Sequence, residues 1–135
     1  MLPSTADRVP LHTAPAINAR IARQTDDNIA RYRAAGPQSI QQRLSELDRE
    51  WDIERAIEAN ASSLALVGLV LGAFVNRRFL VLPAAVAAFL LQHALQGWCP
   101  PVPVLRRLGF RTQSEIERER CALVRLLEDA VPGKT

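Results

Sequence analysis

The hydrophobic residues of this chain are concentrated in two uncharged runs near its middle. Residues 61–75 form a run of fifteen residues without a charge, residues 79–91 form a second run of thirteen, and Asn-Arg-Arg separates them. Neither run has a polar face at helical spacing, and no segment alternates hydrophobic and polar residues as an amphipathic strand does. The pattern predicts an all-α fold in which two apolar helices, 60–75 and 79–95, form a hairpin.

Helices that are apolar on every side must be enclosed on every side, by lipid or by protein. Fifteen residues rise about 22 Å, which is short of a hydrocarbon layer of about 30 Å, so length favours a soluble helical bundle that buries the hairpin. The remaining segments offer only narrow apolar stripes, too few to enclose two such helices. The eight large apolar side chains of the first run contribute roughly −2.5 to −5 kcal/mol to insertion. We therefore expect a membrane-inserted helical hairpin over 60–98 that enters the bilayer as a unit, and we keep the soluble helical bundle as the alternative.

Small residues in both runs are spaced for close contact between helices. Those of the first run follow one another at intervals of four, three and four residues and include a G-x-x-x-G pattern, which lets helix backbones approach closely in a membrane. Two alanines of the second run are the expected opposing face. The contact forms either within the hairpin or between copies of the chain, and the residues are Ala61, Ala65, Gly68, Gly72, Ala84 and Ala88.

Amphipathic helices are predicted over residues 16–59, before the hairpin. Residues 1–15 contain three prolines and are expected to be a mobile N-terminal arm. A first helix over 16–35 stops at Gly36, and Pro37 suits the first turn of the next helix because its missing N–H would have no partner there. The next helix has one apolar face and then loses the stripe near Asp52; its face consists of Ile40, Leu44, Leu47 and Trp51.

A last amphipathic helix is predicted over residues 112–130, after a proline-containing connector at 99–111. Thr112 can cap this helix while Glu115 reaches back, as in the S/T-x-x-E capping box. The apolar stripe of the helix is formed by Ile116, Leu123 and Leu127. The face from Ile40 to Trp51 either packs on this stripe or lies along a membrane surface.

Charge and composition exclude several classes of function. The net charge of +3 divides into about −1 for residues 1–60, +2 for 61–95 and +2 for 96–135. Arginines alternate with acids in both flanks, as in "DREWDIER", which we expect to form a solvated, ion-paired helix face, so no patch of one sign is available to follow a nucleic-acid backbone. Two cysteines and two histidines at unrelated spacings form no metal framework. The apolar region begins too late for a secretory signal, so we expect neither export nor disulfides.

The distribution of arginines predicts how the hairpin is oriented. The segments beside the termini carry six arginines within about twenty residues of the spans, against two at the turn, and positively charged loops remain in the cytoplasm. Both termini are therefore expected in the cytoplasm. The expected interface anchors are Trp98 on the cytoplasmic side and the snorkelling Arg77 and Arg78 at the turn. The six arginines are Arg43, Arg49, Arg55, Arg106, Arg107 and Arg111.

The segments that flank the hairpin resemble a known family. "WDIERAIEAN" precedes it and "GWCPPVPVLRRLGFRT" follows it, as in the YgaP-like inner-membrane domain family of bacteria, whose members have two short transmembrane helices, a G-x-C-P step and an L-G-x-x-T ending. The connection after the cysteine is longer than is usual in the family and lacks its typical tyrosine. The resemblance implies a bacterial inner-membrane location and the hairpin fold, and the family's own activity is unassigned. The matching residues, within about 50–113, are Gly97, Cys99, Pro100, Leu108, Gly109 and Thr112.

Cys99, in the sequence "GWCPP", is the candidate reactive residue. Gly97, Trp98 and the two prolines together suit the end of a helix at a membrane interface, and this role needs no sulfur. A free thiol in a reducing cytoplasm can instead carry a persulfide, bind a soft metal ion or sense oxidation. Arg106 and Arg107 would favour the thiolate if the connector folds back. His93 is either a ligand beside Cys99 or an interfacial polar group with a satisfied hydrogen bond, and Cys121 is expected to be a small buried filler.

No catalytic constellation is visible, so we expect no enzyme and no cofactor. The sequence favours a small, multi-pass inner-membrane protein that acts as an interaction or scaffold module. Its expected partners are the lipid bilayer, further copies of itself through the hairpin and another membrane protein, and no nucleic acid. The alternative function is a thiol-dependent accessory in the handling of sulfur species or soft metals, centred on Cys99.

Overall fold

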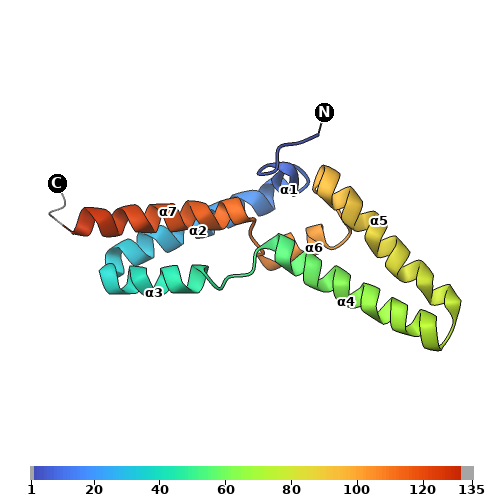
Figure 1. Ribbon diagram of the computed structural model, residues 1–135. Coiled ribbons are helices and arrows are strands. Elements are labelled where there is room, and N and C mark those ends of the chain that lie inside the picture. The colour runs from blue at the N-terminus through green and yellow to red at the C-terminus, as the bar shows by residue number, and fades with distance from the viewer. Residues whose placement is uncertain (1, 132–135) are drawn as a thin grey trace.

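The chain folds into helices, and the computed structural model describes residues 2–131. No strand occurs within that range, which confirms the all-α prediction. A bundle of three helices lies at one end of the molecule and a long hairpin projects from the other (Figure 1). The helices are α1 (Arg8–Leu11), α2 (Pro15–Ala35), α3 (Pro37–Leu47), α4 (Ile53–Phe74), the short 3-10 helix η1 (Arg77–Leu80), α5 (Val81–Gln96), α6 (Val102–Leu108) and α7 (Gln113–Ala130).

The bundle is made of α2, α3 and α7, and its core joins the two predicted amphipathic stripes. Ile40 and Leu47 of α3 pack with Ile116 and Leu123 of α7, all at most 3% exposed. Of the two alternatives for the α3 face, packing on the C-terminal stripe is therefore the one observed. Trp51 does not belong to this face, because α3 ends at Leu47 and the Trp51 side chain is 46% exposed.

Local capping explains where the long helices begin. Thr112 accepts a hydrogen bond from the backbone N–H of Glu115, and the Glu115 carboxylate accepts one from the backbone N–H of Thr112, which confirms the predicted capping box. Asp52 caps α4 in a similar way through the N–H of Arg55. Because α4 then runs unbroken from Ile53 to Phe74, the first hairpin helix begins seven residues before its predicted start at residue 60.

Two segments that were expected to be irregular are folded. The N-terminal arm contains α1, and Val9 within it is only 1% exposed because it packs into a core beneath the hairpin. The connector contains α6, which begins with prolines at positions where a helix needs no N–H donor. Both corrections place additional structure at the base of the hairpin.

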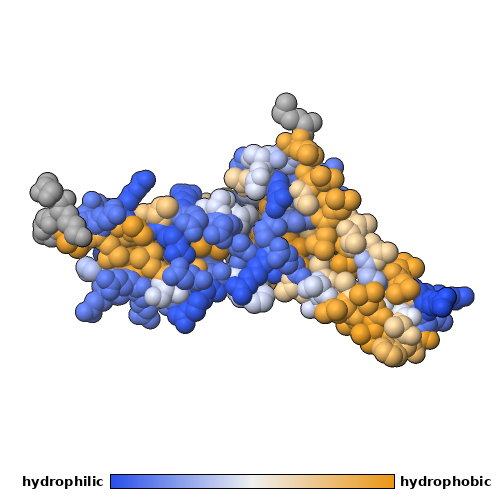
Figure 2. Space-filling model, in the orientation of Figure 1, coloured by the Kyte–Doolittle hydropathy of each residue, from blue (hydrophilic) through white to orange (hydrophobic). Residues whose placement is uncertain are grey.

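The hairpin consists of α4 packed against η1 and α5. Ile53–Phe74 and Arg77–Gln96 are long and apolar enough to cross a membrane, and few of their side chains are buried inside the protein. Figure 2 shows hydrophobic residues over both hairpin helices, hydrophilic residues at the hairpin tip, and a mostly hydrophilic surface with a smaller hydrophobic area over the bundle. The bundle closes its core upon itself and leaves the apolar surface of the hairpin uncovered.

Candidate functional site

The base of the hairpin is where segments distant in sequence meet. Val9 of α1, Ile53 and Ile57 of α4, Cys99 and Val102 form one buried core there, each at most 2% exposed. Leu90 of α5, together with Leu105 and Phe110, covers its edge. This core fixes the first turns of α4 against the end of α5, so polar groups on these helices are held at defined distances.

His93 and Glu54 form the polar centre of this region. Nε2 of His93 lies 2.7 Å from Oε2 of Glu54, and Arg8 donates from Nη2 to Oε1 of the same carboxylate at 2.9 Å. Arg8 also donates to the backbone carbonyl of Ala94 at 3.1 Å. The His93 side chain is about 5% exposed, whereas Arg8 and Glu54 are partly exposed, and the cluster ties the N-terminal segment to both hairpin helices.

The bonding of His93 leaves one ring nitrogen without a partner. An ionised carboxylate can only accept, so Nε2 is the donor to Glu54, and in a neutral ring Nδ1 is then an acceptor. Within residues 2–131, Nδ1 is buried and has no hydrogen-bond partner. The satisfied hydrogen bond expected of His93 is the one that it makes to Glu54.

Cys99 lies beside the His93 ring. Its side chain is 2% exposed to solvent, yet it lines an apolar cavity of about 310 Å³ between α4, α5 and residues 99–101. An imidazole acceptor next to a thiol can take the thiol proton and leave the nucleophilic thiolate. The sequence placed these two residues in one region, but it gave no signal for Glu54 as the group that orients the ring.

Gly97 ends α5, as the sequence predicted, and it does so in the left-handed conformation, with φ 79° and ψ 13°. A Cβ atom at this position would lie 2.5 Å from the backbone of Arg8. Glycine is therefore required twice, for its positive φ and for the close approach of the N-terminal segment.

The two connector arginines do not serve the Cys99 thiol. Arg106 is fully buried, and its guanidinium makes two bonds to the Glu115 carboxylate, at 2.6 and 2.8 Å. It also donates to Asn18 and Thr13. Arg107 is exposed. The expectation that these charges would stabilise a thiolate is wrong because Arg106 is committed to holding α6, α2 and α7 together.

The predicted small residues divide into two groups. Gly68 and Gly72 are buried against the second half of the hairpin, where an added Cβ would lie 2.5 Å from Pro83 and 2.4 Å from Leu80 respectively. Ala61 lies at the same interface and Ala65 is half-buried. Ala84 and Ala88 are exposed. The face opposite the glycines is thus made by Leu80, Leu82 and Pro83.

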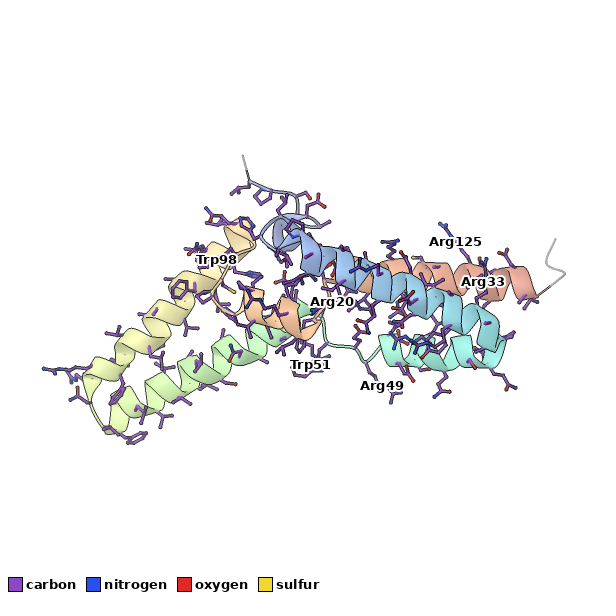
Figure 3. All side chains as sticks on the ribbon, turned by 180° about the vertical axis from the view of Figure 1, so that it is seen from behind. Arg20, Arg33, Arg49, Trp51, Trp98 and Arg125 are labelled. Carbon is purple, nitrogen blue, oxygen red and sulfur yellow. The ribbon has the colours of Figure 1, made fainter. Side chains whose placement is uncertain are left out.

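The residues predicted to anchor the hairpin lie at its two ends. Arg77 and Arg78 are exposed at the tip, beside the turn between α4 and α5. Trp98 is half-buried and lies at the end of α5, while Trp51 lies near the start of α4 (Figure 3). The hairpin therefore has cationic side chains at one end and a tryptophan beside each helix at the other.

Two further expectations concern sulfur and metals. Cys121 is exposed on α7 and is not a buried filler, because the apolar stripe of that helix turns a different side toward α3. Among residues 2–131, no group of three or more His, Cys, Asp or Glu side chains is placed to hold a metal ion.

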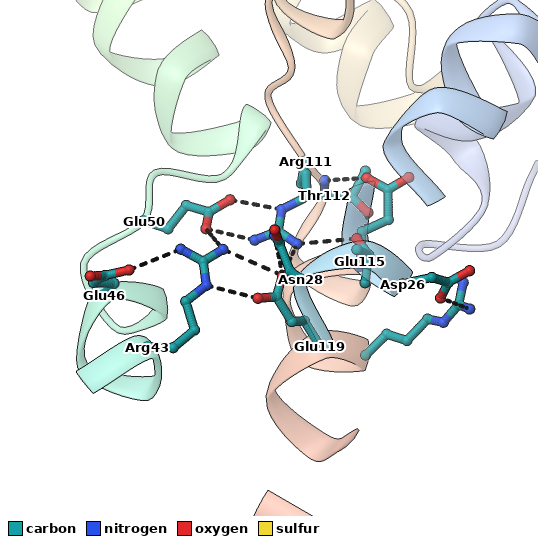
Figure 4. Close-up of polar contacts among 11 residues, drawn as sticks. Asp26, Asn28, Arg43, Glu46, Glu50, Arg111, Thr112, Glu115 and Glu119 are labelled. Atoms are coloured by element: carbon teal, nitrogen blue, oxygen red, sulfur yellow. Dashed lines mark hydrogen bonds and ion pairs between the residues drawn. The ribbon is translucent and has the colours of Figure 1, made fainter. Parts of the chain in front are cut away.

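A buried ion network inside the bundle was not foreseen (Figure 4). Glu119 is completely buried, and it accepts hydrogen bonds from Arg43 at 2.8 Å and from Arg111 at 2.5 Å. Glu50 holds the other side of Arg111 through two bonds, at 2.8 and 2.6 Å. The segment expected to be a solvated face thus supplies Glu50 to an interior network, which joins α3, the link before α4 and the connector.

The network also determines the charge state of its carboxylate. Burial by itself would raise the pKa of Glu119, but the hydrogen bonds from Arg43 and Arg111 outweigh it and hold that pKa below its usual value. The pKa of Glu115 is lowered against the same effect of burial, by Arg106 and by Thr112. Both carboxylates are therefore ionised at neutral pH.

Comparisons of this chain with protein-family models, with curated proteins and with solved structures find no match.

Proposed function

We propose that this chain is a bacterial inner-membrane protein whose α4–α5 hairpin enters the bilayer and whose α2–α3–α7 bundle is a cytoplasmic interaction module. The observation that carries the proposal is the uncovered apolar surface of the hairpin. Side chains along the second half of α4 are among the most exposed, including Leu66 at 63%, Val70 at 55% and Phe74 at 86%. A contiguous apolar surface of this kind marks a site of interaction with a membrane or another protein.

The arrangement of the bundle argues against the soluble alternative. The large apolar residues of α3 and α7 pack against each other in the bundle core, and no other described segment covers the outer faces of the hairpin. Lipid can provide that cover. The apolar part of each helix is shorter than the hydrocarbon layer, and snorkelling of Arg77 and Arg78 with local thinning of the bilayer accommodates the difference.

The distribution of positive charge supports an orientation with both termini in the cytoplasm. The bundle and connector carry most of the arginines, whereas the tip carries only Arg77 and Arg78. We also propose that the chain belongs to the YgaP-like family. The support for this proposal is the short hairpin followed by the step that contains Gly97 and Cys99.

Self-association through the hairpin completes the proposed scaffold role. Because Gly68 and Gly72 are occupied within the hairpin, contacts between copies would fall on the outer faces. Ala84 and Ala88 of α5 are small and exposed there. Small residues of this kind allow close approach between membrane helices.

Cysteine labelling tests the topology, since the structure supplies a reference thiol. Native Cys121 is exposed on the bundle, and Arg78→Cys in a Cys99→Ser background adds a second exposed thiol at the tip. In intact cells an impermeant maleimide should label residue 78 and leave Cys121 unlabelled until lysis. Labelling of Cys121 in intact cells would contradict the orientation, and release of the chain by alkaline carbonate would contradict insertion.

A second proposed function, thiol chemistry at Cys99, rests on the free Nδ1 of His93 beside it. If His93 accepts the thiol proton, His93→Gln should shift the pH profile of Cys99 alkylation toward higher pH, whereas the neighbouring change Gln92→Ala should not. An unchanged pH profile in His93→Gln would refute the proposal that His93 activates the Cys99 thiol and would leave His93 a structural residue.

A further inference from the structure

A second and larger cavity lies along the hairpin near its base. Its volume is about 520 Å³, and it lies between the first half of α4 and the middle of α5. Three residues at or just before the start of α4 form a polar rim: Trp51, Arg55 and Glu58. The floor below them is apolar or small and includes Ala61, Ala65, Pro83, Val86 and Leu90.

The rim of this cavity marks the boundary between polar and apolar surroundings. Arg55 and Glu58 also line a polar cavity of about 460 Å³ on the bundle side, together with Asp48, Asp52 and Glu54. Glu58 precedes Ala61, the first residue of the uncharged run, by three residues and Arg55 precedes it by six, which correspond to about 4.5 and 9 Å of helix rise. The polar layer of a bilayer is roughly 5–8 Å deep on each side, so Glu58 lies within that layer and Arg55 at its outer edge if the hairpin is inserted.

Arg55 and Glu58 carry opposite charges one helical turn apart, and yet they do not neutralise each other. The Arg55 guanidinium lies over the Trp51 ring, with Cζ 4.5 Å from the centroid. Within residues 2–131 neither Arg55 nor Glu58 takes part in an ion pair. The rim thus offers one cation and one anion, both available to a ligand that carries the complementary pair above an apolar floor.

We propose that this cavity binds one phospholipid with a zwitterionic headgroup that ends in a primary ammonium, a phosphatidylethanolamine. Arg55 receives the phosphate, Glu58 accepts hydrogen bonds from the ammonium, and an acyl chain lies along the floor past Ala61 and Ala65. This assignment rests on the proposed insertion of the hairpin, and it deepens that function by naming the lipid that the base of the hairpin recognises.

The charges of the rim discriminate against other lipids. An anionic headgroup such as phosphatidylglycerol would satisfy Arg55 but offer no ammonium to Glu58. A choline headgroup carries a quaternary ammonium that has no N–H to donate to Glu58. Specificity therefore arises from a hydrogen-bonded ion pair at Glu58 that only the ethanolamine headgroup can form.

Quenching of Trp51 fluorescence tests this assignment directly. The chain has two tryptophans, so Trp98→Phe leaves Trp51 as the only reporter at the rim. The full chain is reconstituted in phosphatidylcholine vesicles that contain a minor fraction of lipid brominated in its acyl chains, with an ethanolamine, choline or glycerol headgroup. The ethanolamine lipid should quench at about a tenfold lower fraction than the choline lipid, the equivalent of about 1.4 kcal/mol for one charge-assisted hydrogen bond.

Variants separate the headgroup contacts from the apolar contact. Glu58→Gln should abolish the preference for ethanolamine over choline, whereas Glu117→Gln, at a half-buried position of α7 in the bundle, should leave it intact. In the chain with both tryptophans, native mass spectrometry should show ethanolamine lipid retained in preference to the other two, which makes the result independent of Trp98→Phe. Equal quenching by all three lipids would overturn the lipid assignment while leaving insertion intact, and no quenching by any would overturn both.

Discussion

Removal of the Glu119 carboxylate is the most severe single change that the bundle offers. Glu119→Ala leaves two guanidinium groups, those of Arg43 and Arg111, without the buried anion that each contacts at 2.8 and 2.5 Å. Both arginine side chains are themselves largely buried, at 16% and 8% exposure. Water therefore cannot readily replace the lost partner.

The expected loss is large compared with the stability of a small domain. Breaking a buried ion pair by removing one partner costs about 3–5 kcal/mol, and domains are stable by only about 5–15 kcal/mol. Glu117→Ala is the matched control two residues earlier, because Glu117 forms only a partly exposed pair with Arg120. Exposed pairs of this kind contribute about 0.2–1 kcal/mol.

Urea unfolding of the full chain in detergent micelles measures this difference. The micelle keeps the hairpin helical, so the change in far-UV circular dichroism reports on α2, α3 and α7. Glu119→Ala should lower the urea midpoint strongly, and Arg43→Ala in the same chain should then cost much less than it does alone, because the two side chains act in one network. A Glu119→Ala loss no larger than that of Glu117→Ala would refute the claim that the network holds the bundle together.

Three further predictions concern the hairpin, pH and the thiols. Gly68→Val should destabilise the hairpin toward SDS by about 1–3 kcal/mol through overpacking, whereas Ala73→Val on the exposed side of α4 should have little effect; equal effects would mean that the glycine face is not packed. The pKa of Glu119 is lower in the folded protein than its usual value of 4.5. The ionised carboxylate therefore stabilises the fold fully above pH 4.5, and this stabilisation is lost as the pH falls further. The urea midpoint should drop on acidification, and it should drop less in Glu119→Gln. Cys99 should react with maleimide at least about tenfold more slowly than Cys121, since it is exposed only by local opening, and comparable rates would show that the base of the hairpin is open.

Features of the fold that depend on neighbouring residues could be predicted from the sequence. The capping box at Thr112, the proline at the start of α3 and the left-handed Gly97 are each fixed by the chemistry of a few adjacent positions. The stripes containing Ile40 and Ile116 could be recognised from helical spacing, which made their packing one of two expected outcomes.

The interior polar contacts could not be predicted, because they join residues far apart in the chain. Arg43 and Glu119 are 76 positions apart, and His93 and Glu54 are 39 apart. A charged residue in an amphipathic helix has the same sequence signature whether it faces water or a buried partner. The sequence therefore indicated Cys99 and His93 as candidates but not the carboxylate that orients the imidazole.

Helix α6 shows a different limit of local reasoning. Three prolines at 100, 101 and 103 suggested an irregular connector, since proline breaks a helix interior. In the structure they precede or occupy the first turn, where no N–H is required, and the helix then runs to Leu108. The buried Arg106 on this helix is bonded to Glu115, and this contact holds α6 against the start of α7.

The central claim, that lipid encloses the hairpin, is tested most directly by a spin label on its exposed face. Val70 lies in the uncharged part of α4 with 55% of its surface exposed, so Val70→Cys in a chain with Cys99→Ser and Cys121→Ser accepts a label without displacing packed neighbours. In reconstituted vesicles, the label should collide readily with oxygen, which concentrates in the bilayer, and rarely with a water-soluble nickel chelate. Frequent collision with the nickel chelate would place residue 70 in water and contradict the account.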